Sequence, residues 1–247
     1  MCDSPLTVDT FSKLLPWPLF GKIAVAVSGG ADSMALTLLT HQWCQQNKVA
    51  MVALTVDHQL RPHSKEEAEQ VHTWLTGHGI EHHILTWQHE GISTGIQKKA
   101  REARYALLFD WCHQHNVSAL LTAHHALDQW ETFMMRLSKG SGLKGLCGIR
   151  PVTPTPFGVL IRPFLTVHPS QLLKTLHHLG QSFVEDPSNE NTNFTRIRFR
   201  RLYQTLEQEG VDVDSISKTI QRFQQVDDFL ENLSSEAACA CFENNYL

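Results

Sequence analysis

Apolar runs alternate with amphipathic segments of helical length through the first 140 residues of the chain. The apolar runs predict strands at residues 22–28, 49–57, 82–87 and 118–125. The segments that follow them predict helices at about 32–46, 64–76, 95–115 and 128–140. Strands this apolar are typical of a sheet covered on both faces, and the alternation indicates right-handed βαβ crossovers. The pattern therefore predicts an α/β fold with a doubly wound, mostly parallel sheet.

The pattern changes after residue 140. A glycine-rich stretch, "GSGLKGLCG" (140–148), precedes "RPVTPTPFGVLIRPF" (150–164), whose prolines predict a hairpin at the edge of the sheet. Helical patterns return at about 168–180 and 214–235. We expect a main domain of residues 1–205 and a small helical C-terminal extension of residues 206–247.

Composition narrows the class of protein. The 247 residues carry a net charge of −4, which argues against wholesale coating of nucleic acid but allows a local basic patch. The six cysteines form no C-x-x-C pair, which argues against a zinc ribbon, an iron–sulfur site or a disulfide framework. The N-terminus does not have the pattern of a signal peptide, and no apolar run reaches membrane-spanning length. We expect a cytoplasmic protein that does not enter a membrane.

The short stretch "SGGADS" (28–33) joins the first predicted strand to the first predicted helix. Gly29 and Gly30 would let backbone N–H groups face an anion, and the helix N-terminus adds partial positive charge. Ser28 and Ser33 add hydroxyl groups on both sides of the turn, which favours a phosphate loop over an ordinary βα turn. Asp32 either caps the helix or holds Mg²⁺ beside the phosphates.

Two better-known phosphate loops are excluded, because the chain has neither G-x-x-x-x-G-K-[ST] nor G-x-G-x-x-G. The stretch instead resembles the S-G-G-x-D-S pyrophosphate loop (PP-loop) of the N-type ATP pyrophosphatases, which cleave ATP between its α and β phosphates. Further segments follow in a familiar order: "VDHQLRPHS" (56–64), "REARYALL" (101–108), "AHHALDQWETFMMRLSKGSGLKGL" (123–146), "RPFL" (162–165) and "EDPSNENTNFTRIRFR" (185–200). Together they resemble the tRNA(Ile)-lysidine synthetases over residues 23–201.

That family attaches lysine to the wobble cytidine of a tRNA(Ile) with a CAU anticodon. The resemblance implies ATP and Mg²⁺ as cofactors, L-lysine and tRNA as partners, an adenylated tRNA intermediate, and release of AMP and pyrophosphate. It implies a catalytic set of Asp32, Asp128 and Arg104, with Asp32 beside Mg²⁺ and Arg104 as a candidate ligand of the ATP phosphates. The expected ATP-binding residues are Ser28, Gly29, Gly30, Ala31, Asp32 and Ser33.

Arginines gather after residue 195, and in an otherwise acidic chain they favour contact with a phosphate backbone. The expected tRNA-binding residues are Arg196, Arg198 and Arg200. Phe199, Leu202 and Tyr203 recur there at helical spacing, so the segment is expected to form an amphipathic helix. The alternative is an ordinary solvated face.

The chain departs from the family at two positions. The usual pattern is His-His-x-Asp-Asp-Gln-x-Glu-Thr, and Leu127 stands where the first aspartate belongs. Ile197 follows Arg196, where an Arg-Asn pair would normally continue. A zinc site at His124 and His125 is disfavoured, because adjacent residues at a strand end do not share a face.

Two other functions stay open alongside lysidine synthesis. One is a tRNA cytidine thiolase, which shares the pyrophosphate loop but normally needs cysteines. The other is a degenerate nucleotide- or RNA-binding module without catalysis, suggested by Leu127 and Ile197. The sequence also leaves open whether the chain forms a homodimer.

Overall fold

The structure of the chain is a computed structural model. It describes all residues except 1–3, 17–18, 20, 90–93, 186–194 and 244–247, and it leaves out the side chains of 195–197, 204 and 238–243. The chain forms two units. Unit 1 is Met1–His125 with Pro151–Pro187, and unit 2 is Ala126–Arg150 with Ser188–Leu247. The expected division at residue 205 stays a prediction.

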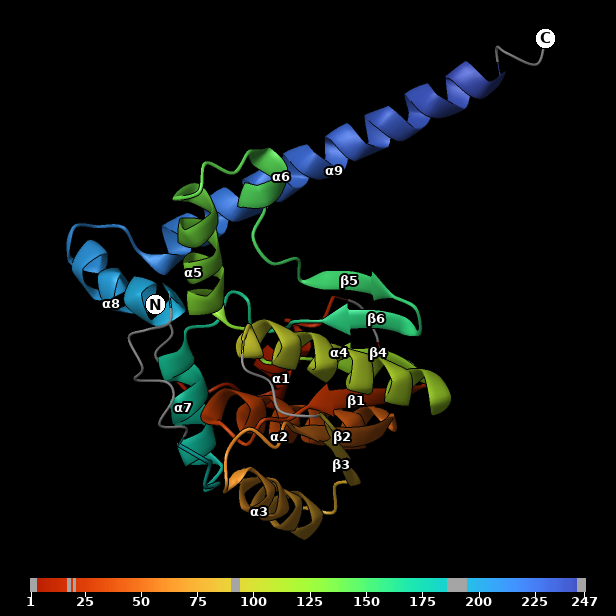
Figure 1. The fold of residues 1–247 in the computed structure, drawn as a ribbon, viewed down its shortest axis with the longest axis vertical. Helices are drawn as coiled ribbons and strands as arrows, with labels where there is room; N and C mark the ends of the chain where they lie inside the picture. The colour runs from red at the N-terminus through yellow and green to blue at the C-terminus, as the bar shows by residue number, and fades with distance from the viewer. Residues whose placement is uncertain (1–3, 17–18, 20, 90–93, 186–194, 244–247) are drawn as a thin grey trace. The chain divides into compact units, whose positions relative to one another are not determined.

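Unit 1 is built on one six-stranded sheet with the strand order β3-β2-β1-β4-β6-β5 (Figure 1). The strands are β1 (Lys22–Ala26), β2 (Ala50–Asp57), β3 (His82–Thr86), β4 (Val117–Leu121), β5 (Val152–Thr155) and β6 (Gly158–Ile161). All neighbouring pairs are parallel except β5 with β6. The α/β class, the mostly parallel sheet and the edge hairpin are confirmed.

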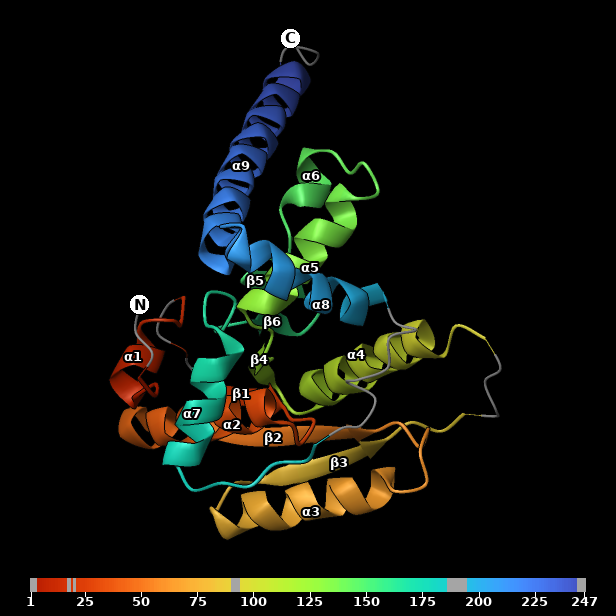
Figure 2. The same cartoon turned by 90° about the vertical axis from the view of Figure 1, so that its left-hand side faces the viewer.

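Helices cover both faces of this sheet. They are α1 (Val8–Ser12), α2 (Ala31–Asn47), α3 (Ser64–Gly77), α4 (Ile96–Gln114) and α7 (Pro169–His178). Ile23 and Val25 of β1 pack in the apolar cluster of α1, α2, α3 and α7, while Ala24 and Ala26 pack in the cluster of α4. Figure 2 shows α3 and α4 on opposite sides of the sheet. This explains the unbroken apolar run of β1, since both of its faces are buried.

The strand order reverses at β1, which lies between β2 and β4. Ligands of open parallel sheets bind at such a point, beyond the carboxyl ends of the strands. The loop that follows β1 is residues 28–33, so the topology of unit 1 puts the predicted phosphate loop at this point.

Unit 2 is helical and consists of α5 (Ala126–Leu137), α6 (Leu143–Leu146), α8 (Thr195–Gln208) and α9 (Val213–Glu243). Its apolar cluster is centred on Trp130, Tyr203 and Val213, and the rings of Trp130 and Tyr203 meet edge to face at 5.2 Å. The amphipathic helix expected after residue 195 is confirmed as α8. No helix among the described residues is long and apolar enough to cross a membrane.

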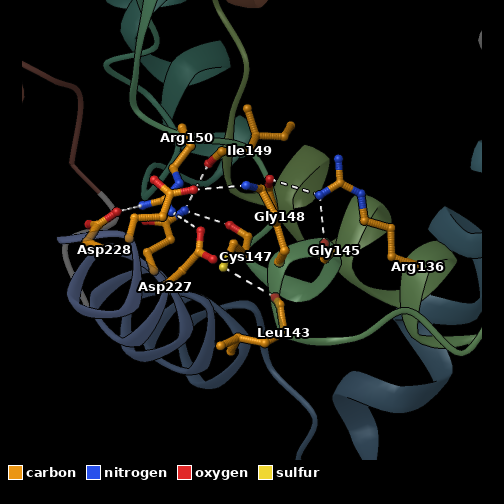
Figure 3. A network of polar contacts seen from close by, with 12 residues as sticks. Arg136, Leu143, Gly145, Cys147, Gly148, Ile149, Arg150, Asp227 and Asp228 are labelled. Carbon is orange, nitrogen blue, oxygen red and sulfur yellow. Dashed lines mark hydrogen bonds and ion pairs between the residues drawn. The ribbon is translucent and has the colours of Figure 1, made fainter. Parts of the chain in front are cut away.

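The glycine-rich stretch 140–148 is held by polar side chains of unit 2 (Figure 3). Arg136 donates to the carbonyl oxygens of Gly145 and Gly148 at 2.7 and 3.1 Å. Gly148 has φ +62°, and a Cβ there would lie 2.5 Å from Oε1 of Gln129. Arg150 next to this stretch makes ion pairs with Asp227 and Asp228 of α9. These contacts tie the stretch to α5 and α9. Gly148 is required there because of its positive φ and the closeness of Gln129.

Candidate active site

The phosphate loop takes its shape from Gly29. Its φ is +86°, in the left-handed region, and its carbonyl oxygen accepts a hydrogen bond from Val184 N at 2.9 Å. A Cβ at this position would lie 2.7 Å from Val71 Cγ2 and 3.1 Å from Val184 Cγ2. Both the backbone conformation and the lack of space therefore require glycine here.

The two serines of the loop have different environments. Ser33 is buried, and its Oγ accepts from Ser28 N at 3.1 Å and donates to Gly30 O at 3.0 Å. Because that hydroxyl has one proton, Ser28 Oγ is the donor in its 3.2 Å contact with Ser33 Oγ. Ser33 thus holds the loop closed, and the exposed Ser28 is the hydroxyl open to a ligand. Both serines stand in the same sequence motif, and the motif gives them the same expected role. Only the structure separates the two roles.

The N-terminus of α2 offers backbone donors. Gly30 is the N-cap residue and no described side chain caps the helix. The N–H groups of the first turn have no acceptor within a helix, and they carry the positive end of its dipole. Asp32 lies in this first turn. The arrangement can bind an anion such as pyrophosphate at the end of β1.

His125 is a site residue that the sequence interpretation missed. Its Nε2 lies 3.6 Å from Asp32 Oδ2, with side chains 7% and 36% exposed, respectively. From the sequence, we considered this histidine only as a zinc ligand. The available signal was that His125 follows β4 and Asp32 follows β1, and that neighbouring parallel strands end at one edge. His125 therefore lies beside the carboxylate of Asp32, part of which stays exposed.

Arg104 lies on α4 in unit 1. Burial lowers the pKa of its guanidinium, with a smaller opposing effect of Tyr105 and a further lowering by Arg101. The group still carries its charge at neutral pH. Within the described part of the chain, no hydrogen bond or ion pair of Arg104 is found. This half-buried cation is suited to bind an anionic ligand.

Leu127 and Asp128 lie in the first turn of α5 in unit 2. Asp128 is half-buried in the first turn of that helix, and its approach to Asp32 stays a prediction. Leu127 packs against the apolar cluster of Trp130, Tyr203 and Val213. The departure from the family pattern therefore has a physical basis, because this position contributes to the core of unit 2.

The predicted tRNA-binding arginines lie on α8. The side chain of Arg196 is outside the described residues, as is that of Ile197. Arg198 is exposed. Arg200 Nε donates to Oε1 of Glu131 at 2.7 Å, and the Glu131 side chain is only 1% exposed. Arg200 thus neutralises a buried carboxylate of α5, a role that the sequence did not indicate.

Comparison with known proteins matches residues 8–206 to the model of the PP-loop domain family. A tRNA(Ile)-lysidine synthase of Zymomonas mobilis is 41% identical over 236 residues, which is 94% of this chain and 70% of the relative. One from Bradyrhizobium sp. is 38% identical over 94% of this chain and 66% of the relative. The U34-tRNA thiolase NcsA from Methanococcus maripaludis shares the fold with a TM-score of 0.76, at 17% identity, over 88% of this chain and 77% of that one.

The length of these relatives exceeds that of the chain. The chain spans 70%, 66% and 60% of three lysidine synthases that it matches. The matched region nevertheless includes the phosphate loop, Arg104 and Asp128. The expected family and its phosphate-loop domain are confirmed by these matches.

Gly29 and Gly30 make a matched pair for testing the loop. Gly29→Ala should lower the free energy of unfolding by about 2–4 kcal/mol, since it adds strain at positive φ and a clash with Val71. Gly30 has φ −70°, and a Cβ there would meet only Ser28 Oγ at 3.8 Å. Gly30→Ala should therefore change stability by less than about 0.5 kcal/mol. Urea unfolding of both variants measures the difference, and equal losses would contradict the described loop.

Leu127→Asp tests the packing of unit 2. A carboxylate introduced beside Trp130 and Tyr203 should destabilise the chain by about 1–3 kcal/mol. Leu127→Met fills a similar volume and should cost less than about 1.5 kcal/mol. Thermal unfolding followed by circular dichroism compares them. A fully stable Leu127→Asp variant would show that this position does not belong to the apolar cluster.

Proposed function

Because the chain belongs to the PP-loop family and, within it, to the tRNA(Ile)-lysidine synthases, we propose that it joins lysine to C2 of the wobble cytidine in a tRNA(Ile) with a CAU anticodon. ATP supplies the energy, and AMP and pyrophosphate are released. The observation that carries the proposal is the phosphate loop. It is found in a chain that is about 40% identical to lysidine synthases over most of its length. A tRNA substrate implies that the protein acts in the cytoplasm.

The chemical difficulty is the oxygen at C2 of cytosine, which is a poor leaving group. In the first step, this oxygen attacks the α-phosphate of ATP, and pyrophosphate leaves. In the second step, the ε-amine of lysine attacks C2 and loses a proton, and the oxygen departs with AMP. The cytidine must leave the stack of the anticodon loop to be reached.

The loop of residues 28–33 suits the first step. The open N–H groups at the start of α2 are the donors for pyrophosphate, and the exposed hydroxyl of Ser28 joins them by turning its one proton from Ser33 Oγ to the ligand. Fixed donors directed at the charge that develops on the leaving group are expected to make a large catalytic contribution. Gly29 supports this role, because its conformation brings the backbone rather than a side chain to the ligand.

Asp32 fits a Mg²⁺ ion that accompanies ATP. Mg²⁺ is usually bound by one or two carboxylates together with substrate phosphates, and Asp32 supplies one such carboxylate, with His125 beside it. When bound, the ion would neutralise charge on the phosphates. Asp128 is proposed to assist there or to orient the nucleophile, and Arg104 to bind an ATP phosphate.

The two alternative functions are less well supported. A thiolase would need reactive thiols, whereas burial raises the pKa of Cys44 and Cys112 to about 12. Burial also raises the pKa of Cys147, so each of these three described thiols stays protonated at neutral pH. A degenerate binding module was suggested by Leu127, whose packing in unit 2 gives that residue a structural reason.

The products of ATP consumption test the proposed reaction. Incubation with ATP, lysine and tRNA(Ile) should yield AMP and pyrophosphate, measured by ion-exchange chromatography. Asp32→Asn should reduce turnover by at least about 100-fold with an unchanged unfolding midpoint. Asp110→Asn, on the exposed side of α4, serves as the control and should keep full turnover. Formation of ADP and phosphate would refute the assignment.

Arg198 and Arg200 should differ in their effects. Arg198→Gln should weaken tRNA binding and reduce the slope of log affinity against log salt by about one, with no loss of stability. Arg200→Gln should also destabilise the chain by about 1–3 kcal/mol, because the buried carboxylate of Glu131 loses this ion pair. Filter binding over a salt series and thermal unfolding measure the two effects. An unchanged slope for Arg198→Gln would show that this residue belongs to an ordinary solvated face and does not contact tRNA.

A further inference from the structure

The C-terminal half of α9 carries a row of large apolar side chains that face solvent. The row consists of Val226, Phe229, Leu230 and Leu233, which we call the α9 stripe. Their exposed fractions are 47%, 61%, 49% and 45%. Positions three and four residues apart lie on one side of a helix, so these side chains form one continuous surface. An exposed apolar surface of this kind marks an interaction site.

The opposite side of α9 is already occupied within unit 2. Ile220 is buried there, and Asp227 makes its ion pair with Arg150. Gln224 Nε2 donates to the carbonyl oxygen of Cys147 at 2.7 Å. At 100° per residue, the α9 stripe is turned by roughly 135° about the helix axis from these inward positions. The stripe therefore faces away from the glycine-rich stretch, and Figures 1 and 2 show α9 continuing past α6.

Two opposite charges flank the α9 stripe, one at each end. Arg222 lies four residues before Val226, and Glu236 lies three residues after Leu233. Both are exposed, and within the described part of the chain neither makes an ion pair. Their directions around the helix differ by only about 40°, so both lie on the same flank of the stripe. The position midway between them is 229, at the centre of the stripe.

This arrangement is complementary to itself. When two identical helices pair antiparallel about a two-fold axis, the same flank of each helix meets. A centre at residue 229 then puts Arg222 of each copy opposite Glu236 of the other copy. A parallel pair would instead keep these two charges about 21 Å apart along the helix axis. The charges and the apolar side chains thus fit one occupant, a second copy of this chain.

We propose that the α9 stripe is the interface of a homodimer in which α9 of two copies packs antiparallel. Apolar residues spaced by three and four positions are those through which paired helices interlock. One stripe of four large side chains makes a small interface, so the dimer is weak and reversible. The inference does not depend on the proposed function, because it uses only the surface of unit 2.

Sedimentation equilibrium of the full chain tests the dimer. Over roughly 1–300 μM protein, the mean mass should rise from one chain toward two, with a dissociation constant on the order of 10 μM. Leu230→Glu puts two like charges at the centre of the interface and should raise this constant by at least about 30-fold. Leu137 at the end of α5 is equally exposed, at 48%, so Leu137→Glu is a matched control and should leave the constant unchanged.

The flanking charges test the antiparallel arrangement. Arg222→Glu or Glu236→Arg alone sets like charges opposite each other at both ends of the interface, and each should weaken the dimer by about fivefold. The double variant restores opposite charges and should return the dissociation constant to within about twofold of the wild type. A double variant as weak as the single ones would overturn the antiparallel arrangement.

Two other results would overturn the dimer itself. One is a mean mass of a single chain at every concentration, and the other is a dimer that Leu230→Glu leaves intact. In either case, filter binding of tRNA shows whether the surface has a different occupant. A lower tRNA affinity of Leu230→Glu than of Leu137→Glu would then assign the α9 stripe to RNA.

Discussion

The conformation of Gly29 is the constraint on which the site depends. Its positive φ turns the chain between β1 and α2, and Val71 and Val184 pack so close that no side chain fits. That turn determines where the N-terminus of α2 and its open N–H groups point. Ser33 then closes the loop from within, while the hydroxyl of Ser28 stays exposed. A local backbone requirement thus places backbone donors where they suit an anion.

Much of the fold could be predicted because its signals are local. Both faces of β1 are buried, and the unbroken apolar run at 22–28 therefore predicts a central strand. The hairpin of β5 and β6 follows from its prolines and glycine. The short helix α1 was not predicted, since five residues give too little periodicity. The grouping of α5 with α8 and α9 was also not predicted, because it depends on contacts far apart in sequence.

The same difference between local signals and long-range contacts separates the predicted from the unpredicted residues of the site. The phosphate loop was predictable, since six consecutive residues carry its chemistry. His125 with Asp32, and Arg200 with Glu131, were not, because each pair joins distant positions that only the fold brings together. Leu127 shows the limit of reading a motif alone: the sequence marks it as a departure, whereas packing beside Trp130 explains it.

The central claim is that this phosphate loop serves the ligation of lysine to a tRNA base. Mass spectrometry of nucleosides tests it most directly, after tRNA(Ile) with a CAU anticodon is incubated with the protein, ATP and isotopically labelled lysine. The account predicts a labelled cytidine derivative whose mass increases by one lysine minus one water. Unmodified cytidine, in a sample where the protein is folded and binds both ATP and tRNA, would contradict it.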